Sequence, residues 1–438
     1  MTKLPNDFLW GASTSAYQVE GANLSDGKGP SVQDVKQLPP LVSDFSVASD
    51  HYHRFKEDIA LLKKLGLTAY RFSISWSRIL PAGTGQINAA GLAFYDQLID
   101  ECLQAGITPI VTLYHFDLPA ALAESGGWLN RETITAYVDY SRIVFEAFGD
   151  RVRYWLTINE QNMLVLANQS IVTGQKSLRD SFQENHHMMV AQAKVIKAYH
   201  DAGYLGKIGP APNIAVGYAA SSAPADIVAA QWFNSVRNWL FLDPVVFGHY
   251  QPQAWQFLQQ LHLEPKVTSD DLETLAAGRC DFITFNYYNS NTVAASATTD
   301  AFTFRSPTEF AAPGFFKAVD NPRLPHTQFG WEIDPVGLRV TLHELYNRYD
   351  LPLLITENGI GGEDELDEDG YIHDQYRIDY LAAHIAEMTQ AVSEGVELLG
   401  YCPWSALDLI STHEGMKKRY GVHLCQPNRF GFKESTPY

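Results

Sequence analysis

Two glutamates stand where buried strands are expected to end, and together they could carry out acid–base and nucleophilic chemistry. An apolar run at 353–355 leads into Glu357, and a second stretch at 154–158 leads into Asn159 and Glu160. Apolar runs of this length, bounded by turn residues, are typical of strands buried on both faces of a parallel sheet. An isolated buried carboxylate is very costly, so each glutamate must be paired, hydrogen-bonded or open to a cleft.

Two carboxyl groups that flank one scissile bond are what glycoside hydrolysis requires. A separation of about 5–5.5 Å permits a covalent glycosyl-enzyme intermediate, whereas a wider one leaves room for an attacking water. Glu160 and Glu357 are far apart in the chain, so the sequence does not give their separation. The alternative for each glutamate is a structural ion pair with an arginine or lysine at the end of its strand.

The elements that must position these glutamates alternate between strands and helices. Strands are predicted at 8–13, 69–74, 108–114, 154–160, 207–214, 282–286, 353–357 and 398–404. Helices are predicted at 51–65, 89–105, 131–148, 182–202, 268–277, 336–348 and 376–394. Eight such alternations imply right-handed parallel crossovers and an α/β fold, a closed (β/α)8 TIM barrel with catalytic groups at the C-terminal strand ends.

Other segments carry weaker signals. Residues 17–21 are expected to form a loop, residues 289–329 are expected to be irregular, and Thr268 with Asp271 fits a capping box. A long irregular loop inside a compact domain is usually functional. Contacts to the aglycone are therefore expected from 289–329 and from the segments around Thr173 and Phe233.

Composition narrows the class of protein. The chain has 438 residues and 46% hydrophobic content, and no repeat or linker interrupts it. These features predict one elaborated domain that spans residues 1–438. Its net charge of −18 argues against a nucleic-acid partner. No apolar run approaches the roughly 18 residues that span a bilayer, and the N-terminus lacks a signal-peptide core. The four cysteines lie far apart, as expected for free thiols in a cytoplasmic protein.

Short segments along nearly the whole chain resemble glycoside hydrolase family 1. The resembling segments are 8–12 with 17–21, 70–78, 114–119, 157–160, 286–288, 355–359 and Trp404-Ser405. Each segment is short, but they occur in the family's order. The resemblance implies the barrel fold and an enzyme that retains anomeric configuration.

The resemblance also implies roles for single residues. Glu160 resembles the general acid/base and Glu357 the nucleophile. An acid of this kind must hold a proton near neutral pH, which apolar surroundings or a nearby carboxylate favour. Arg71 is the cation expected to keep the nucleophile ionised, and Tyr288 is expected to donate a hydrogen bond to it. The remaining family contacts to the sugar fall on Asn159, at the 2-hydroxyl, and on Gln18, His115 and Trp404.

The segment 408–421 concerns the sugar 6-position. Family members that act on unmodified sugars usually have a Glu and then a Trp where Ser411 and Thr412 stand. A hydroxyl, an ammonium and a phenol, here Ser411, Lys418 and Tyr420, can all donate hydrogen bonds to phosphate oxygens. This pattern is similar to the phosphate site of bacterial 6-phospho-β-glucosidases, and Thr412 favours the gluco over the galacto sugar. The expected partner is a small phosphorylated β-glucoside, bound by a monomer or a homodimer.

Several alternatives stay open at this point. A β-glucosidase or β-galactosidase for unmodified sugars, a 6-phospho-β-galactosidase and a catalytically inactive sugar-binding barrel are the competing functions, and 417–419 could be a solvated basic turn. The acidic run 363–370 suggests a calcium loop, but Tyr376 stands where that loop needs Glu. No metal and no cofactor is expected. Residues 433–438 resemble the start of the family's closing helix.

Overall fold

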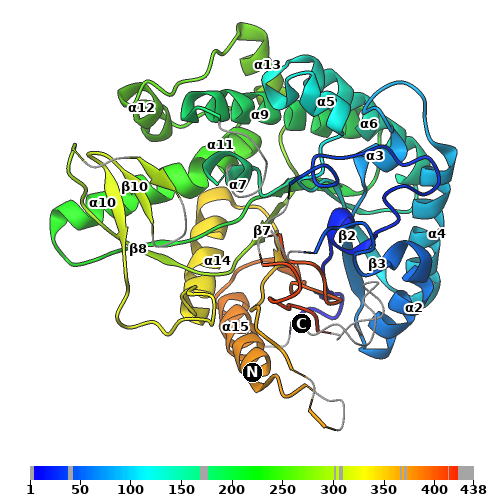
Figure 1. Ribbon diagram of the computed structural model, residues 1–438. Coiled ribbons are helices and arrows are strands. Elements are labelled where there is room, and N and C mark those ends of the chain that lie inside the picture. Colours follow the sequence, from blue (N-terminus) through cyan, green and yellow to red (C-terminus); the bar gives the residue numbers. More distant parts are fainter. Residues whose placement is uncertain are drawn as a thin grey trace.

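The structure is a computed structural model that describes residues 4–37, 43–167, 176–299, 302–304, 309–365, 367–368, 372–412 and 414–422. Within these ranges, eight parallel strands form the centre of the molecule, in two hydrogen-bonded groups of four (Figure 1). In chain order they are β1 (Leu9–Trp10), β2 (Ala69–Ser73), β3 (Thr108–Tyr114), β4 (Tyr154–Asn159), β5 (Lys207–Ala211), β7 (Ile283–Asn286), β12 (Leu353–Glu357) and β13 (Leu398–Tyr401).

The two groups join into a closed barrel. On one side, Ser13 beyond β1 forms a parallel bridge with Arg71 of β2, and the Thr14 amide donates to the Arg71 carbonyl at 2.9 Å. On the other side, Asn213 beyond β5 bridges Asn286 of β7. The predicted (β/α)8 TIM barrel is confirmed.

The inside of the barrel is filled from every strand. One buried cluster takes a residue from each strand or from directly beside it, namely Leu9, Ala69, Ile110, Leu156, Ala211, Phe282, Leu354 and Cys402. Such a layer makes the interior a packed core and leaves the strand ends to form the site.

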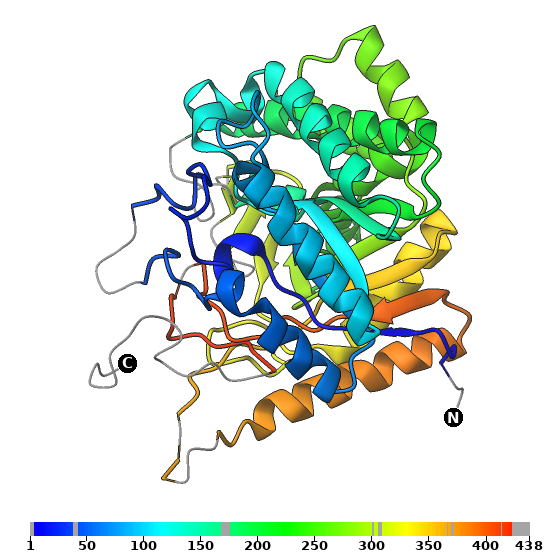
Figure 2. The same ribbon diagram turned by 90° about the vertical axis from the view of Figure 1, so that its right-hand side faces the viewer.

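Helices cover the outside of the strands (Figures 1 and 2). The seven predicted helices are present as α2 (His51–Lys64), α4 (Ala89–Ala105), α6 (Glu132–Phe148), α9 (Leu178–Asp201), α13 (Ser269–Ala277), α14 (Pro335–Tyr349) and α15 (Gln375–Ser393). The other helical segments are α1 (Ala16–Val19), α3 (Trp76–Ile79), α5 (Ala120–Glu124), η1 (Gly127–Leu129), α7 (Gln161–Leu166), α10 (Pro224–Asn234), η2 (Ser235–Trp239), α11 (Leu240–Phe247) and α12 (Pro252–Gln260). In both views α9 and α15 lie on opposite sides of the strands.

Local side-chain chemistry explains where several helices begin. The predicted capping box of α13 is confirmed, because Thr268 accepts from the Asp271 amide and Asp271 accepts from the Thr268 amide. Asn88 caps α4 and Ser177 caps α9 through their side-chain oxygens. Asp364 of the acidic run accepts hydrogen bonds from Tyr376 and Arg377 at 2.6 Å each, so this carboxylate anchors the start of α15.

Two predictions of irregular structure were wrong. Residues 16–19 form the short helix α1, which is too brief to show a helical period in the sequence. Residues 289–329 include β8 (Asn291–Ala294), β9 (Thr303–Phe304), β10 (Phe310–Ala312) and β11 (Phe316–Val319), which form a small sheet with β6 (Gly217–Ala219). This sheet lies beside α10 at one edge of the molecule (Figure 1). Phe310 and Phe316 of this sheet pack on Phe233. Its strands of two to four residues are too short to show an alternation of apolar and polar residues in the sequence.

Some predicted bounds were too long. Regular pairing covers Leu9–Trp10 rather than 8–13, and Lys207–Ala211 rather than 207–214. Cys102, Cys280 and Cys402 are buried free thiols, as predicted, whereas Cys425 and residues 433–438 lie outside the described ranges. Within those ranges, no helix is long and apolar enough to cross a membrane.

Candidate active site

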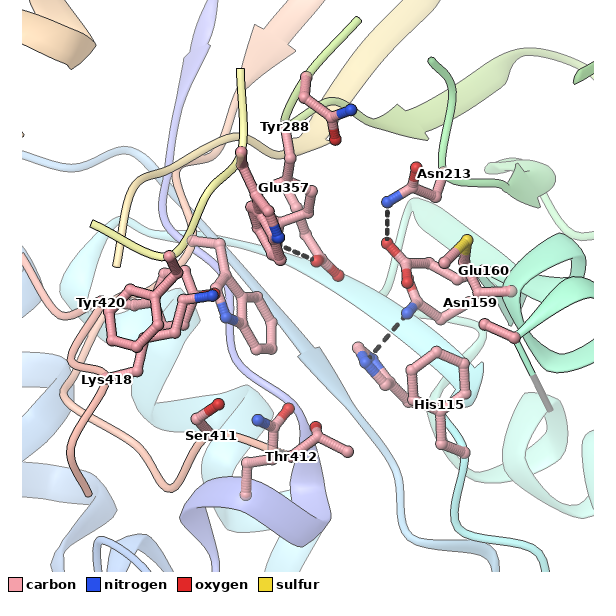
Figure 3. Close-up of a pocket in the computed structure, with 18 of the residues that line it drawn as sticks. His115, Asn159, Glu160, Asn213, Tyr288, Glu357, Ser411, Thr412, Lys418 and Tyr420 are labelled. Carbon is pink, nitrogen blue, oxygen red and sulfur yellow. Dashed lines mark hydrogen bonds between the residues drawn. The ribbon is translucent and has the colours of Figure 1, made fainter. Parts of the chain in front are cut away.

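A pocket with a volume of about 440 Å³ opens at the C-terminal ends of the barrel strands (Figure 3). Glu160 directly follows β4, and Glu357 is the last residue of β12. Figure 3 shows their side chains on facing walls of this pocket. The structure therefore brings together two carboxylates that lie far apart in the sequence.

Glu357 is held by two strong donors. Its Oε1 accepts from Arg71 Nη1 at 2.6 Å, and its Oε2 accepts from the Tyr288 hydroxyl at 2.6 Å. Arg71 is fully buried in β2, and its Nε donates to Thr112 Oγ1 at 2.8 Å. Both carboxylate oxygens are thus fixed by a donor at a residue that lines the pocket.

The protonation of Glu357 reflects opposing effects. The net effect is a pKa of about 7 for Glu357, with burial as the largest cause of the rise and the nearby Glu160 carboxylate as a smaller one. The charge of Arg71 and the hydrogen bonds from Tyr288 and Arg71 lower this pKa. A buried carboxylate near a second negative charge is harder to ionise, so Glu357 keeps its proton to a higher pH than an exposed glutamate does.

Asn159 connects Glu357 to Glu160 through hydrogen bonds, by way of Arg71 on one side and Asn286 on the other. Its Oδ1 accepts from Arg71 Nη2 at 2.6 Å and from Asn286 Nδ2 at 3.1 Å. Its Nδ2 donates to His115 Nε2 at 3.0 Å. Burial, with a smaller effect from the Arg71 charge, lowers the pKa of His115 well below its usual range. His115 is therefore a neutral imidazole at physiological pH.

Glu160 has a different environment. Its Oε1 accepts from Asn213 Nδ2 at 2.8 Å and from Asn286 Nδ2 at 2.9 Å, so both donors are neutral amides. Its backbone lies in the left-handed region with φ 45° at the start of α7. Such a conformation is costly for a residue with a side chain and is concentrated at functional sites. Gln161, where many family members have Pro, donates to Asn185 Oδ1 at 2.7 Å and thereby ties α7 to α9.

The other predicted sugar contacts line the same pocket. His115 and Trp404 stack with ring centroids 5.8 Å apart, and both are buried. Gln18 reaches the pocket from α1, where its Nε2 donates to the Ile410 carbonyl at 2.9 Å. An aromatic face beside polar groups suits a sugar ring, which has apolar C–H faces and polar edges.

Ser411, Lys418 and Tyr420 lie together on the opposite side of the pocket from Glu160 (Figure 3). Lys418 is 2% exposed, and within the described ranges no carboxylate oxygen lies within 4.0 Å of its Nζ. Its Nζ lies 3.8 Å from the ring centroid of Trp331 and 4.5 Å from that of Phe329. Burial lowers the pKa of Lys418 to about 8, so this ammonium stays mostly charged at neutral pH.

A carboxylate adjoins this group of donors. Glu414 lines the pocket, and its Oε2 accepts from the Ser411 hydroxyl at 2.8 Å. The Thr412 and Tyr17 hydroxyls form a hydrogen bond at 2.8 Å, and both residues line the pocket next to Ser411. The side of the pocket formed by Ser411, Lys418 and Tyr420 therefore has the Glu414 carboxylate among its hydrogen-bond donors.

The sequence did not reveal several residues of this site. Asn213 and Arg237 border Glu160, and Trp331 and Glu414 border Lys418. Asn213 lies near the C-terminal end of the expected fifth strand at 207–214, which is a usable signal, whereas nothing in the sequence places Trp331 in the pocket. Phe233 itself is fully buried under the small sheet and is absent from the pocket lining, whereas Arg237 of the same segment lines the pocket, so the aglycone contact expected from the segment around Phe233 stays a prediction. Thr173 lies outside the described residues.

The fold and the pocket together define a class of protein, the barrel enzymes that cleave glycosidic bonds with two carboxylates. The family model of glycosyl hydrolase family 1 matches residues 1–433. The chain therefore belongs to glycosyl hydrolase family 1, and it is a glycoside hydrolase.

Curated relatives come from two substrate groups. The chain is 43% identical to aryl-phospho-β-D-glucosidase BglC of Bacillus subtilis, over 95% of this chain and 91% of the relative. It is 40% identical to β-glucosidase A of Thermotoga maritima, over 96% of this chain and 92% of the relative. A solved structure of β-glucosidase from Thermotoga maritima in complex with castanospermine superposes with a TM-score of 0.88 at 38% identity, covering 98% of this chain and 97% of that one.

Proposed function

We propose that the protein is a retaining 6-phospho-β-glucosidase. The observation that carries this proposal is the buried Lys418 ammonium, which lines the same pocket as Glu160 and Glu357 and has no carboxylate at ion-pair distance within the described ranges. A buried cation is costly unless it is paired, and a phosphate dianion on the substrate would pair it. Tyr420 adds a hydroxyl donor beside it, and Ser411 adds another once its hydroxyl turns from Glu414 to the phosphate.

In the first step, Glu357 is the nucleophile. One of its carboxylate oxygens attacks the anomeric carbon, and the bond from that carbon to the leaving oxygen breaks. Glu160 gives its proton to the leaving oxygen. Arg71 and Tyr288 hold the attacking carboxylate in place at 2.6 Å each, which fixes the direction of attack.

In the second step, Glu160 acts as the base. It takes a proton from a water molecule while the water oxygen attacks the anomeric carbon, and the bond to Glu357 breaks. Two inversions at the same carbon leave its configuration unchanged. Asn159 is the donor proposed for the sugar 2-hydroxyl, a contact that strengthens as positive charge develops on the ring.

The remaining residues position the sugar. Trp404 and His115 form the wall against which the ring lies, and Gln18 contacts its hydroxyls. Beside Ser411, the 6-phospho-galactosidases usually have a tryptophan, whereas this chain has the smaller side chain of Thr412. This difference favours the gluco configuration. The enzyme would act in the cytoplasm, on a sugar already phosphorylated.

Glu414 supports a second candidate function. A carboxylate among the donors at the 6-position can accept a hydrogen bond from a free 6-hydroxyl, as in enzymes for unmodified β-glucosides. The Thermotoga maritima β-glucosidase is nearly as similar to this chain as the aryl-phospho-β-D-glucosidase. Unmodified β-glucosides are therefore the competing substrates.

Rates on p-nitrophenyl β-D-glucoside with and without a 6-phosphate separate the two functions. We expect a higher kcat/KM with the phosphate, carried mainly by a lower KM, because Lys418 is remote from the bond that breaks. A Glu414→Gln variant should increase this preference by removing a negative charge that repels phosphate. Faster turnover of the unphosphorylated glucoside by the native enzyme would reject the proposal in favour of the β-glucosidase.

A further inference from the structure

Arg237 is a buried cation whose position the glycosidase mechanism above leaves unexplained. It lies in the π-helical turn η2 and lines the pocket on the side of Glu160. Within the described ranges no carboxylate oxygen lies within 4.0 Å of its guanidinium, and burial lowers the pKa of Arg237 to about 10 while the charge of Glu160 raises it. π-Helical turns are rare and are found frequently at functional sites.

Both terminal nitrogens of Arg237 bind one residue. Nη1 donates to the Asn213 carbonyl and Nη2 donates to Asn213 Oδ1, each at 2.6 Å. The same Asn213 presents its Nδ2 to Glu160 Oε1 at 2.8 Å. Because the amide oxygen is engaged by a cation, rotating the amide by half a turn would place its NH2 group against the guanidinium, where two donors would meet.

The backbone of Asn213 is fixed as well. Asn162 of α7 accepts from the Asn213 amide at 3.1 Å and donates to its carbonyl at 2.6 Å. Farther along, Asn238 of η2 exchanges two hydrogen bonds with the backbone of Ala215. The π-helical turn thus binds the segment after β5 at two places, Asn213 and Ala215, and it places the Arg237 guanidinium against the side-chain amide of Asn213.

We infer that Arg237 is a positioning residue for the general acid/base, which acts through Asn213 to hold the Glu160 carboxyl group toward the leaving oxygen. Arg237 itself does not touch the reacting atoms. It fixes which end of the Asn213 amide faces Glu160, so that Glu160 always meets an N–H donor there. This inference depends on the role proposed for Glu160 and is independent of the 6-phosphate.

The test uses the dependence of rate on the leaving group. Departure of a 2,4-dinitrophenolate needs little help from an acid, whereas departure of a phenolate needs a proton. The Arg237→Met variant removes the charge and both donors with little change in side-chain length. On the 2,4-dinitrophenyl glycoside we expect kcat/KM to change less than about threefold. On the phenyl glycoside we expect a loss of about tenfold or more, as general acid catalysis contributes about 10²- to 10⁴-fold.

Three further variants complete the experiment, each assayed on whichever sugar, phosphorylated or not, the native enzyme cleaves faster. Arg237→Lys keeps the charge and one donor and should recover part of the loss on the phenyl glycoside. It also serves if Arg237→Met does not fold. Arg348→Met removes a matched arginine that donates to Asp243 of α11 outside the pocket, and its effect should not depend on the leaving group.

Glu160→Ala separates failure of this inference from failure of the proposed mechanism. A leaving-group-dependent loss in Glu160→Ala, together with a uniform loss or no loss in Arg237→Met, would overturn the role of Arg237 alone. A uniform loss in Glu160→Ala would overturn the assignment of Glu160 as the acid. In that case the role inferred for Arg237 falls with it.

Discussion

The two sides of the pocket are built differently. On the carboxylate side, Arg71, Asn159 and Asn286 connect Glu357 to Glu160 through hydrogen bonds of 2.6–3.1 Å. On the other side, the Lys418 ammonium lies against aromatic rings, and within the described ranges no carboxylate pairs with it. The carboxylate side is thus connected by hydrogen bonds between protein groups, whereas the proposed function leaves the Lys418 cation to be paired by the phosphate of the substrate.

This difference indicates how the two sides share the work. Bonds that form and break need groups held in place before the substrate arrives, because the rate depends on orientation. Recognition of a remote phosphate needs unsatisfied donors, because the binding energy comes from pairing them. Substitutions on the carboxylate side should therefore lower kcat, and those on the Lys418 side should raise KM.

The largest effect is expected on the carboxylate side. Glu357→Gln removes the proposed nucleophile while keeping the shape of the side chain, and kcat should fall by at least about 10⁴-fold, as for other nucleophile substitutions. Steady-state assays with a p-nitrophenyl substrate measure this loss. Glu344→Gln, at a partly buried glutamate outside the pocket, is the matched control and should leave kcat within about twofold. A Glu357→Gln enzyme with native kcat would refute the assignment.

On the other side, Lys418→Met should act through KM and only on phosphorylated substrate. Loss of a charged hydrogen bond worth about 1.5–3 kcal/mol predicts a 10- to 150-fold lower kcat/KM. The neighbouring Lys417, which is exposed and pairs with Glu363 at 3.0 Å, supplies the control Lys417→Met. Equal losses on phosphorylated and unphosphorylated glucosides would show that Lys418 stabilises the fold and does not select the phosphate.

The pH dependence tests the carboxylate side without a substitution. The nucleophile must be ionised, and burial raises the pKa of Glu357 to about 7, so the ionised fraction is lost as the pH falls through 7. We expect kcat/KM to fall about tenfold per pH unit on the acid side. Tyr288→Phe removes a hydrogen bond that lowers this pKa, so the acid limb should move to higher pH. An acid limb that stays in place in Tyr288→Phe would contradict this account.

The smallest effect concerns the rings around Lys418. Trp331→Leu removes the ring whose centroid lies 3.8 Å from the Lys418 ammonium, and loss of a cation–π contact of about 0.5–1 kcal/mol predicts a two- to fivefold higher KM for the phosphorylated glucoside. Trp239→Leu removes a ring that lies 5.2 Å from Arg348 outside the pocket and is the control. If Trp331→Leu changes kcat and leaves KM unchanged, Trp331 would act on the chemical step and not on binding of the phosphate.

The two sides also differ in how far the sequence predicts them. The strands that end in Asn159 and Glu357 are apolar runs at regular places in the alternation of strands and helices, so the fold and the position of both carboxylates at strand ends could be predicted from the sequence. Trp331 and Glu414 come from connections with no period, and only the tertiary structure brings them next to Lys418. The small sheet around Phe233 was missed for the same reason, because its short strands are defined by packing between distant segments.

One labelling measurement tests both sides together. A 2-deoxy-2-fluoro-β-glucoside 6-phosphate with a good leaving group should form a stable glycosyl ester, because the fluorine slows both steps and the good leaving group speeds only the first. Peptide mass mapping should find the label on Glu357, and Lys418→Met should slow labelling by this reagent but not by its unphosphorylated form. A label on another residue, or faster labelling of the native enzyme by the unphosphorylated reagent, would contradict the account.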